Sequence, residues 1–261
     1  TRQSGLLVID KKTMTTSLFS FDPLDPMSIS SSRFSQVQTV PVSTKKNMAW
    51  VGTTNGLNRV NFSTKSAKRL YKEKSELVQR DTILAVLELE SELLIGSSAG
   101  LIAHNETDGK TTQLINHHIN AVVKTHQDGT VMALGQRKSI LLDNDKNILN
   151  TIKHTTPKTE VLYLGGNQYI LWSKKDVEII MVEQENDYWL WDKGSAPAIP
   201  EEILFDPEGN IWIASKDGLF VGSNTEAPTS FVKHNNQKSK SLFTKTVNNH
   251  LIYIDGAVFE T

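Results

Sequence analysis

Three aromatic residues, Tyr188, Trp189 and Trp191, form the most distinctive group of chemistry-capable side chains in the 261-residue chain. Because successive side chains of a strand point to opposite faces, this segment places two of the aromatics on one face and one on the other. An exposed Tyr or Trp beside Asp192 and Lys193 is suited to stacking on a sugar ring or anchoring a partner protein. In the alternative, two rings fill an apolar core and the third is partly exposed. We predict ligand binding by these three residues, without a catalytic role.

Two further segments carry groups that bind metal ions elsewhere. His117 and His118 are adjacent, and neighbouring strand residues face opposite ways, so both cannot ligate one ion without an irregular loop. Residues 143–147 are Asp-Asn-Asp-Lys-Asn, the oxygen-rich start of a calcium loop, but the later Gly and bidentate Glu of such a loop are missing. A turn explains these residues equally well. We predict no metal site and no cofactor.

Other kinds of chemistry have little support. A Ser, His and Asp triad is recognised by geometry, so the order of these residues in the chain does not establish one. The sequence contains no Gly-rich phosphate-binding loop followed by a helix. The chain has no cysteine, so disulfides and thiolate chemistry are excluded. Its net charge is −1, and the one basic run, residues 63–74, alternates with strand residues, which favours a solvated edge over a nucleic-acid surface. No apolar run in these 261 residues is long enough to span a membrane, and we expect no signal peptide within them.

The elements that position these residues come from an internal repeat. The stretch DPEGNIWIASKDGL (206–219) is matched by NMAWVGTTNGLNRVN (47–61) and more weakly by SELLIGSSAGLIAHN (91–105). Each copy alternates apolar runs with polar or Gly turns, which is typical of strands joined by hairpins. The turn anchors and their fainter equivalents fall at residues 5, 56, 100, 138, 176, 218 and 256. Intervals of about 40 residues are typical of propeller blades.

The repeated turn has a conformational explanation. A tight hairpin needs a positive φ that Gly, Asn or Asp reaches at low cost, and the Trp or Leu before it is placed to fill the space between neighbouring sheets. Burial of such a side chain contributes about 2–3 kcal/mol. We therefore assign a structural and not a functional role to the repeat residues, which are Gly5, Trp50, Gly52, Gly56, Leu57, Gly96, Gly100, Leu101, Asp206, Gly209, Trp212, Gly218, Leu219 and Gly256.

These patterns predict an all-β fold. Helical periodicity is not sustained, and a hydrophobic content of 38% with 22% charged residues excludes the disordered and collagenous classes. We expect residues 1–261 to form a single β-propeller of four-stranded antiparallel blades, six or seven in number. The chain begins and ends at equivalent strand positions. Its termini either pair to close a six-bladed ring or lie in adjacent blades of a seven-bladed one.

The segment TMTTSLFSFDPLDPMSISSSRFSQV (13–37) is more distinctive than the turn itself. With the later Trp-Val-Gly-Thr and Gly-Leu of residues 50–57, it resembles the two-component regulator propeller repeats of bacteria. In that family an Asp-Pro-x-Asp-Pro-x-Ser-(Leu/Ile)-Ser-Ser linker precedes a Trp-(Ile/Val)-Gly-Thr-x-x-Gly-Leu turn. The matching linker residues are Asp22, Pro23, Asp25, Pro26, Ser28, Ile29, Ser30 and Ser31. The resemblance is strong over residues 1–62 and 203–222 and poor between 130 and 200.

The resemblance implies a periplasmic sensor, the extracytoplasmic input of a membrane-anchored histidine kinase, hybrid kinase or diguanylate cyclase at the inner membrane. A longer chain would then carry the membrane helix and the output domain. The expected partner is an unidentified small molecule, with carbohydrate as one candidate, a periplasmic protein, or a second copy in a homodimer, and no nucleic acid. Two alternatives remain: a propeller enzyme of the lyase or lactonase type, and a rigid protein-interaction scaffold.

Overall fold

The computed structural model describes residues 5–10, 12–34, 47–70, 81–124, 129–154, 156–165, 168–173, 177–182, 188–192, 200–206, 210–223, 231–233, 243–247 and 250–254. Within these ranges every regular element is a β-strand, so the all-β prediction is confirmed. The same ranges contain no helix that could cross a membrane. Two repeat residues, Gly209 and Gly256, lie outside the described residues.

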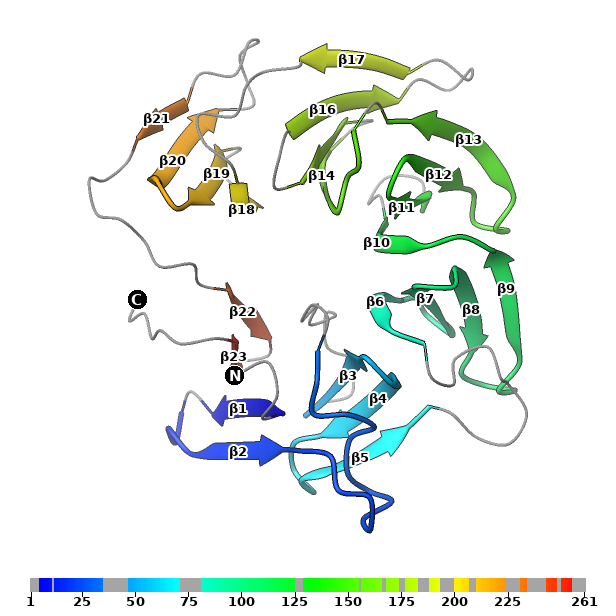
Figure 1. Cartoon of the computed structure of the whole chain (residues 1–261), viewed down its shortest axis with the longest axis vertical. Helices are drawn as coiled ribbons and strands as arrows, with labels where there is room; N and C mark the ends of the chain where they lie inside the picture. Colours follow the sequence, from blue (N-terminus) through cyan, green and yellow to red (C-terminus); the bar gives the residue numbers. More distant parts are fainter. Residues whose placement is uncertain are drawn as a thin grey trace. The chain divides into compact units, whose positions relative to one another are not determined.

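The strands form six antiparallel sheets within the described ranges, and five of them join strands that follow one another in the sequence (Figure 1). A terminal sheet has the order β2-β1-β23-β22, from β1 (Leu6–Asp10), β2 (Thr16–Phe19), β22 (Phe243–Val247) and β23 (His250–Ile254). The β3–β5 sheet contains β3 (Met48–Thr53), β4 (Gly56–Asn61) and β5 (Ser66–Arg69). The β6–β9 sheet contains β6 (Ile83–Glu88), β7 (Glu92–Ser97), β8 (Leu101–Asn105) and β9 (Thr111–Ile115).

The other three sheets repeat the same sequential order. The β10–β13 sheet contains β10 (Ile119–Lys124), β11 (Val131–Gly135), β12 (Lys138–Leu142) and β13 (Ile148–Lys153). The β14–β17 sheet contains β14 (Glu160–Gly165), β15 (Gln168–Trp172), β16 (Val177–Val182) and β17 (Tyr188–Asp192). The β18–β21 sheet contains β18 (Pro200–Phe205), β19 (Asn210–Ser215), β20 (Gly218–Ser223) and β21 (Phe231–Lys233). The hairpins expected near residues 138 and 176, where no Gly-Leu marks the turn, are therefore present.

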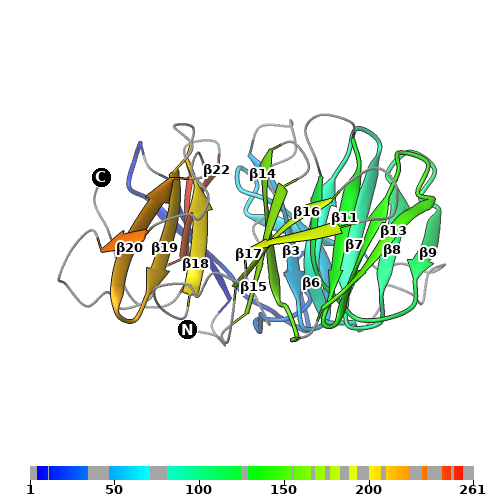
Figure 2. The ribbon, with the colours of Figure 1, turned by 90° about the horizontal axis from the view of Figure 1, so that it is seen from above.

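The chain divides into two compact units, residues 1–122 with 242–261 and residues 123–241. The first unit contains the terminal, β3–β5 and β6–β9 sheets, and the strands of the last lie side by side in both ribbon views (Figure 1, Figure 2). In the terminal sheet β1 pairs antiparallel with β23, with Leu7 opposite Tyr253. Strands from the two ends of the chain thus share one sheet.

A hydroxyl side chain closes the repeated hairpin turn in three sheets. Thr53 Oγ1 donates to the carbonyl of Gly56 at 2.9 Å and accepts the N–H of Asn55. Ser97 and Ser215 make the equivalent bonds to the carbonyls of Gly100 and Gly218. The three glycines have φ angles of +99°, +153° and +129°. These left-handed conformations, and the clash of an added Cβ at Gly100 with the carbonyl oxygen of Ile115, explain why the turn retains Gly.

Glycine also allows close approach of neighbouring strands within residues 1–122 of the first unit. A Cβ on Gly52 would lie 2.7 Å from Ile83 Cγ2, and one on Gly96 would lie 2.9 Å from Ile119 Cγ2. The core beside Gly52 contains buried side chains from both the β3–β5 and β6–β9 sheets, namely Trp50, Leu57, Ile83, Val86, Leu93, Ile95 and Ile102. Trp50 is therefore packed among apolar side chains of both sheets.

The Asp-Pro linker is held against the β3–β5 sheet. Arg69 at the end of β5 donates from Nε to the carbonyl of Ser28 at 2.9 Å and from Nη2 to Ser28 Oγ at 2.7 Å. Asp22 and Asp25 each accept an N–H two residues later in the linker, which fixes two consecutive turns. The basic run at residues 63–74 thus contributes a structural cation, while its neighbour Lys68 is exposed.

A buried polar contact anchors the end of the linker. Asn58 Oδ1 accepts the N–H of Ser30 at 2.8 Å, and Asn58 Nδ2 lies 2.9 Å from Ser30 Oγ. The Ser30 hydroxyl also contacts Thr53 Oγ1 of the repeated turn at 2.9 Å. The linker and the turn are therefore one hydrogen-bonded unit, which explains physically why the two motifs occur together.

Candidate functional site

The sequence-predicted aromatic residues lie on β17, the last strand in the order β14-β15-β16-β17. Trp189 is opposite Met181 and Tyr188 is opposite Val182. The pairing then becomes irregular between Ile179 and Ile180, and Trp191 falls at this irregularity. Since a bulge redirects side chains, simple alternation does not extend through Trp191. The side chains of β17 lie outside the described part of the structure, so their ligand-binding role stays a prediction.

The calcium-like segment is a closed hairpin loop. Asp143 Oδ1 accepts the backbone N–H of Asn147 at 2.8 Å, and Oδ2 accepts its side-chain N–H at 3.0 Å. The side-chain hydrogen bond from Asn147, followed by the backbone bond, lowers the pKa of Asp143. Asp206 and Asn210 make the same pair of bonds at 2.7 and 2.9 Å. The segment therefore reproduces the Asp-x-x-x-Asn loop of the repeat.

The adjacent histidines do not converge on a metal centre in the described residues. His118 Nε2 lies 2.7 Å from Asn120 Oδ1. No group of three or more His, Cys, Asp or Glu side chains that could hold an ion occurs in the portion of the chain that the structure describes.

A hydroxyl–imidazole pair that the sequence pattern did not predict joins β12 to the residue after β13. Ser139 Oγ lies 2.8 Å from His154 Nε2, which is the geometry of a nucleophile and its base. Both residues are buried, and Ser139 is 0% exposed, so no substrate carbonyl can reach its Oγ. Ser139 follows its turn at the place that Leu57 and Leu101 occupy in other sheets. The two side chains hydrogen-bond to each other at a position where other sheets have a core leucine.

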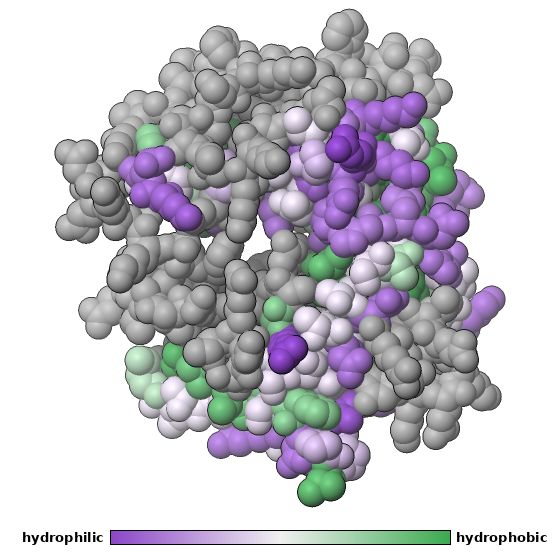
Figure 3. All heavy atoms as spheres, in the orientation of Figure 1, coloured by the Kyte–Doolittle hydropathy of each residue, from purple (hydrophilic) through white to green (hydrophobic). Residues whose placement is uncertain are grey.

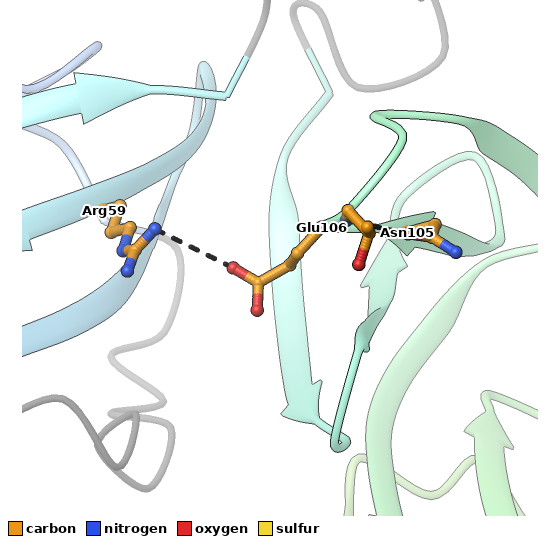
Figure 4. Close-up of polar contacts among 4 residues, drawn as sticks. Arg59, Asn105 and Glu106 are labelled. Atoms are coloured by element: carbon orange, nitrogen blue, oxygen red, sulfur yellow. Dashed lines mark hydrogen bonds and ion pairs between the residues drawn. The ribbon is translucent and has the colours of Figure 1, made fainter.

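A polar cluster lies between the β3–β5 and β6–β9 sheets of the first unit. Trp50 and Arg59 are directly opposite in the β3–β4 register, and the guanidinium carbon lies 5.5 Å from the ring centroid. Arg59 Nη1 also lies 3.9 Å from Glu106 Oε1, across the space between the two sheets (Figure 4). Glu106 is held by the loop in which Asn105 Oδ1 accepts the N–H of Thr107 at 2.8 Å.

Two donors in this cluster are buried without an acceptor among the described residues, Trp50 Nε1 and Arg59 Nε. Both groups only donate hydrogen bonds. A buried donor left unsatisfied costs about 1–3 kcal/mol. The arrangement is chemically suited to an oxygen atom with free lone pairs, such as that of a hydroxyl, carboxylate or water. Neither Arg59 nor Glu106 stood out in the sequence, because they lie far apart in the chain and only the packing of two sheets brings them together.

His104 borders the same cluster on β8. Its Nδ1 lies 3.1 Å from Thr111 Oγ1. Burial lowers the pKa of His104, opposed by the carboxylates of Glu106 and Asp108 and assisted by the Lys68 ammonium. The cations Arg59 and Lys68 thus belong to the β3–β5 sheet, whereas the anions belong to the loop after β8. Opposite charges from β4 and from the loop after β8 therefore face each other between the two sheets.

Comparison with known proteins begins with two negative results, since no family model matches the chain and no curated protein sequence matches it. Solved structures do match. The extracellular domain of the proposed hybrid two-component system BT3049 from B. thetaiotaomicron aligns over 93% of this chain and 39% of its own, with a TM-score of 0.63 and 16% identity. That of BT4673 from the same organism aligns over 96% of this chain and 35% of its own, with a TM-score of 0.65 and 14% identity.

A third similar structure is the computationally designed Ika8 protein, which covers 92% of this chain and 77% of its own at a TM-score of 0.60 and 12% identity. At these identities the likeness concerns the fold alone. This chain therefore has the fold found in extracellular domains of hybrid two-component systems, as the linker and turn residues predicted. It spans well under half the length of the BT3049 and BT4673 domains that it matches.

Proposed function

We propose that this chain is a β-propeller module of the extracytoplasmic input region of a bacterial two-component-type sensor. The observation that carries the proposal is the fold likeness to two extracellular domains of hybrid two-component systems, which extends over 93% and 96% of the chain. The co-occurring linker and turn support it independently. The module would lie on the periplasmic side of the inner membrane as part of a longer chain.

The propeller architecture accounts for the observed sheets. Small antiparallel sheets of sequential strands, repeated along the chain, are typical of blades. The shared terminal sheet is the device by which a propeller closes its ring with one blade made from both ends of the chain. Within the described residues, the sheet count favours six blades over seven.

As an input module the domain binds a signal without converting it. A ligand shifts a receptor only when it binds two receptor states with different affinity. The proposed ligand is a small molecule, with carbohydrate as one candidate, stacked on Tyr188, Trp189 or Trp191. A periplasmic protein is the other proposed partner class. No cofactor or turnover is part of this proposal.

A thermal-shift screen of the purified chain tests ligand binding. Oligosaccharides, organic acids, amino acids and divalent ions would be titrated separately, since a ligand specific for the folded state adds about 2.7 kcal/mol at 100 times its Kd. A dose-dependent rise for one solute class is expected. Trp189→Ala should abolish it, whereas Phe21→Ala, an exposed aromatic outside the β14–β17 sheet, serves as the matched control and should retain it.

The alternatives give different results in the same experiment. A solute that is consumed, together with a tightly bound divalent ion, would contradict the input role in favour of a propeller enzyme. A stable co-purifying protein with a flat solute screen would favour a rigid scaffold. Measurement of autophosphorylation by the full-length receptor, with and without the identified solute, then tests transmission directly.

A further inference from the structure

The terminal sheet ends in a strand whose outer edge has hydrogen-bonding groups directed away from the sheet. The N–H of Asp10 donates to the carbonyl of Thr15 at 2.9 Å, which makes these two residues a hydrogen-bonded pair. Hydrogen-bonded and non-hydrogen-bonded pairs alternate along an antiparallel ladder. Because Thr16 is opposite Ile9 and Leu18 is opposite Leu7, both fall on non-hydrogen-bonded positions. Their N–H and C=O groups therefore point to the outer edge of β2.

The usual protections of an edge strand are missing from β2. Its sequence, Thr-Ser-Leu-Phe, contains neither a charged residue nor proline, and Leu18 is 60% exposed. By contrast, the end strand β5 contains Lys68 and Arg69. Exposed apolar residues continue on both sides of β2, and Figure 3 shows apolar surface along this part of the first unit. They are Met14, Leu18, Phe21, Leu24 and Met27.

Hydrogen bonds within the chain hold the exposed segment after β2 in one conformation without a bound partner. Ser28 Oγ lies 2.8 Å from the carbonyl oxygens of both Asp22 and Asp25, and Arg69 reaches the same carbonyls. The Arg69 guanidinium carbon also lies 5.4 Å from the centroid of the Phe21 ring. A preorganised surface loses little conformational entropy on binding. Leu24, 91% exposed at the tip, has no role in the fold that would explain its exposure.

We propose that β2 pairs antiparallel with β2 of a second copy of this chain across a two-fold axis. Pairing Thr16 with Leu18 of the partner copy, and Leu18 with its Thr16, uses all outward groups of the strand and gives four backbone hydrogen bonds. If the register is shifted so that Leu18 lies opposite Leu18 of the second copy, only the two hydrogen bonds of that central pair form between the two β2 strands. The proposed pairing therefore has the most hydrogen bonds.

The same pairing is complementary in charge. It places the hairpin end of one strand, which carries Lys12, beside the linker end of its partner, which carries Asp22. Lys12 lies in the turn before β2 and Asp22 in the linker after it, and both are exposed. Each opposite-charge contact occurs twice because of the two-fold axis. Met14, 73% exposed, is brought to the apolar linker segment of the other copy. The self-complementarity of β2 is the reason for choosing a second copy as the occupant.

Cysteine cross-linking tests the pairing directly, because the chain has no native cysteine. Two copies of Ser17 would face each other as a non-hydrogen-bonded pair with Cα atoms about 4.5 Å apart, within the span of a disulfide. Ser17→Cys should form a covalent dimer under mild oxidation. Thr112→Cys on β9, the end strand of the β6–β9 sheet, is the matched control and should stay monomeric. Equal cross-linking of the two variants would overturn the proposal, and stronger cross-linking of Leu18→Cys would overturn the pairing.

Sedimentation velocity over a concentration series measures the same dimer without a cross-link. Leu18→Pro removes an outward N–H but none of the bonds to β1, so it should lose the dimer and should unfold at the wild-type midpoint at concentrations where the wild type is monomeric. Lys12→Glu should weaken dimerisation at low salt, and the difference should disappear near 1 M salt, where the Debye length is about 3 Å. A wild-type chain that stays monomeric throughout the series would overturn the proposal. Because no solute is needed, this outcome is independent of the ligand screen.

Discussion

Trp50 and Trp212 occupy the same place in the repeat, yet their indole groups have different surroundings. Trp212 is half-buried, and its Nε1–H donates to Asp206 Oδ2 at 2.7 Å. Trp50 is only 3% exposed, its Nε1 has no acceptor in the described part of the chain, and the Arg59 guanidinium covers its ring. The repeat therefore sets the backbone position of the tryptophan, whereas neighbouring residues decide whether it works as a core residue or as a hydrogen-bonding one.

Alanine substitution should separate the two tryptophans by the largest margin. Trp50→Ala should lower the free energy of unfolding by about 3–5 kcal/mol, because it opens a cavity between two sheets. Trp212→Ala should cost about 1–2 kcal/mol, because much less of the indole is removed from water. Urea denaturation of both variants measures the difference. Equal losses would show that the two side chains are equivalent despite their different burial.

A double-mutant cycle should show that the Trp212 region depends on one carboxylate. Asp206 accepts bonds from both Asn210 and Trp212, so Asp206→Asn and Trp212→Phe should be coupled by about 0.5–1.5 kcal/mol, the net range for a typical hydrogen bond. Asp143→Asn is the matched control. It alters the equivalent loop bond to Asn147 without a neighbouring tryptophan in the bond, and it should be additive with Trp212→Phe.

In the Trp50 region the coupling should be weaker and salt-sensitive. Arg59→Met keeps an apolar stem but removes the cation over the ring, at a cost of about 0.5–1 kcal/mol. The cycle of Arg59→Met with Glu106→Gln should give at most about 1 kcal/mol, since both side chains are partly exposed and 3.9 Å apart. Unfolding at low and high salt measures it. A coupling that persists at 1 M salt would contradict a screened surface ion pair.

The contrast also shows what could be predicted from the sequence. Gly56, Gly100 and Gly218 were identifiable because a positive φ is a local requirement that few residue types meet. Hydroxyl residues suit many roles, so the turn-closing bonds of Thr53 and Ser215 were not predicted. Their geometry became evident only when the hairpins were compared.

Contacts between distant segments were harder to predict. Arg69 lies in a basic run that suggested a solvated edge, but its donors reach carbonyls of the Asp-Pro linker. The Arg59–Glu106 pair depends on how two sheets pack, and Ser139 with His154 replaces a leucine that the repeat would have supplied. Local turn chemistry is thus encoded within a few residues, whereas side-chain partners depend on the tertiary arrangement.

The smallest expected effect is a pH dependence of the free energy of unfolding that arises in the Trp50 region. Burial lowers the pKa of His104, so near its ordinary value of about 6.5 the unfolded chain binds more protons than the folded chain. The free energy of unfolding should therefore fall as the pH drops through that value, and the stabilising contribution should be fully present above it. Glu106 and Asp108 oppose the shift and Lys68 assists it, so the net slope should be shallow.

Substitution of this histidine tests whether the slope belongs to the cluster. His104→Gln keeps a polar group beside Thr111 but cannot take up a proton, so the pH dependence of unfolding between about pH 5 and 8 should flatten. His118→Gln, a histidine paired with Asn120, controls for the loss of an imidazole elsewhere. Asp108→Asn should steepen the wild-type slope, because it removes a charge that favours protonated His104. If Asp108→Asn leaves the slope unchanged, the carboxylates of the β8–β9 loop do not act on this imidazole, and burial alone distinguishes the Trp50 region from the Trp212 region.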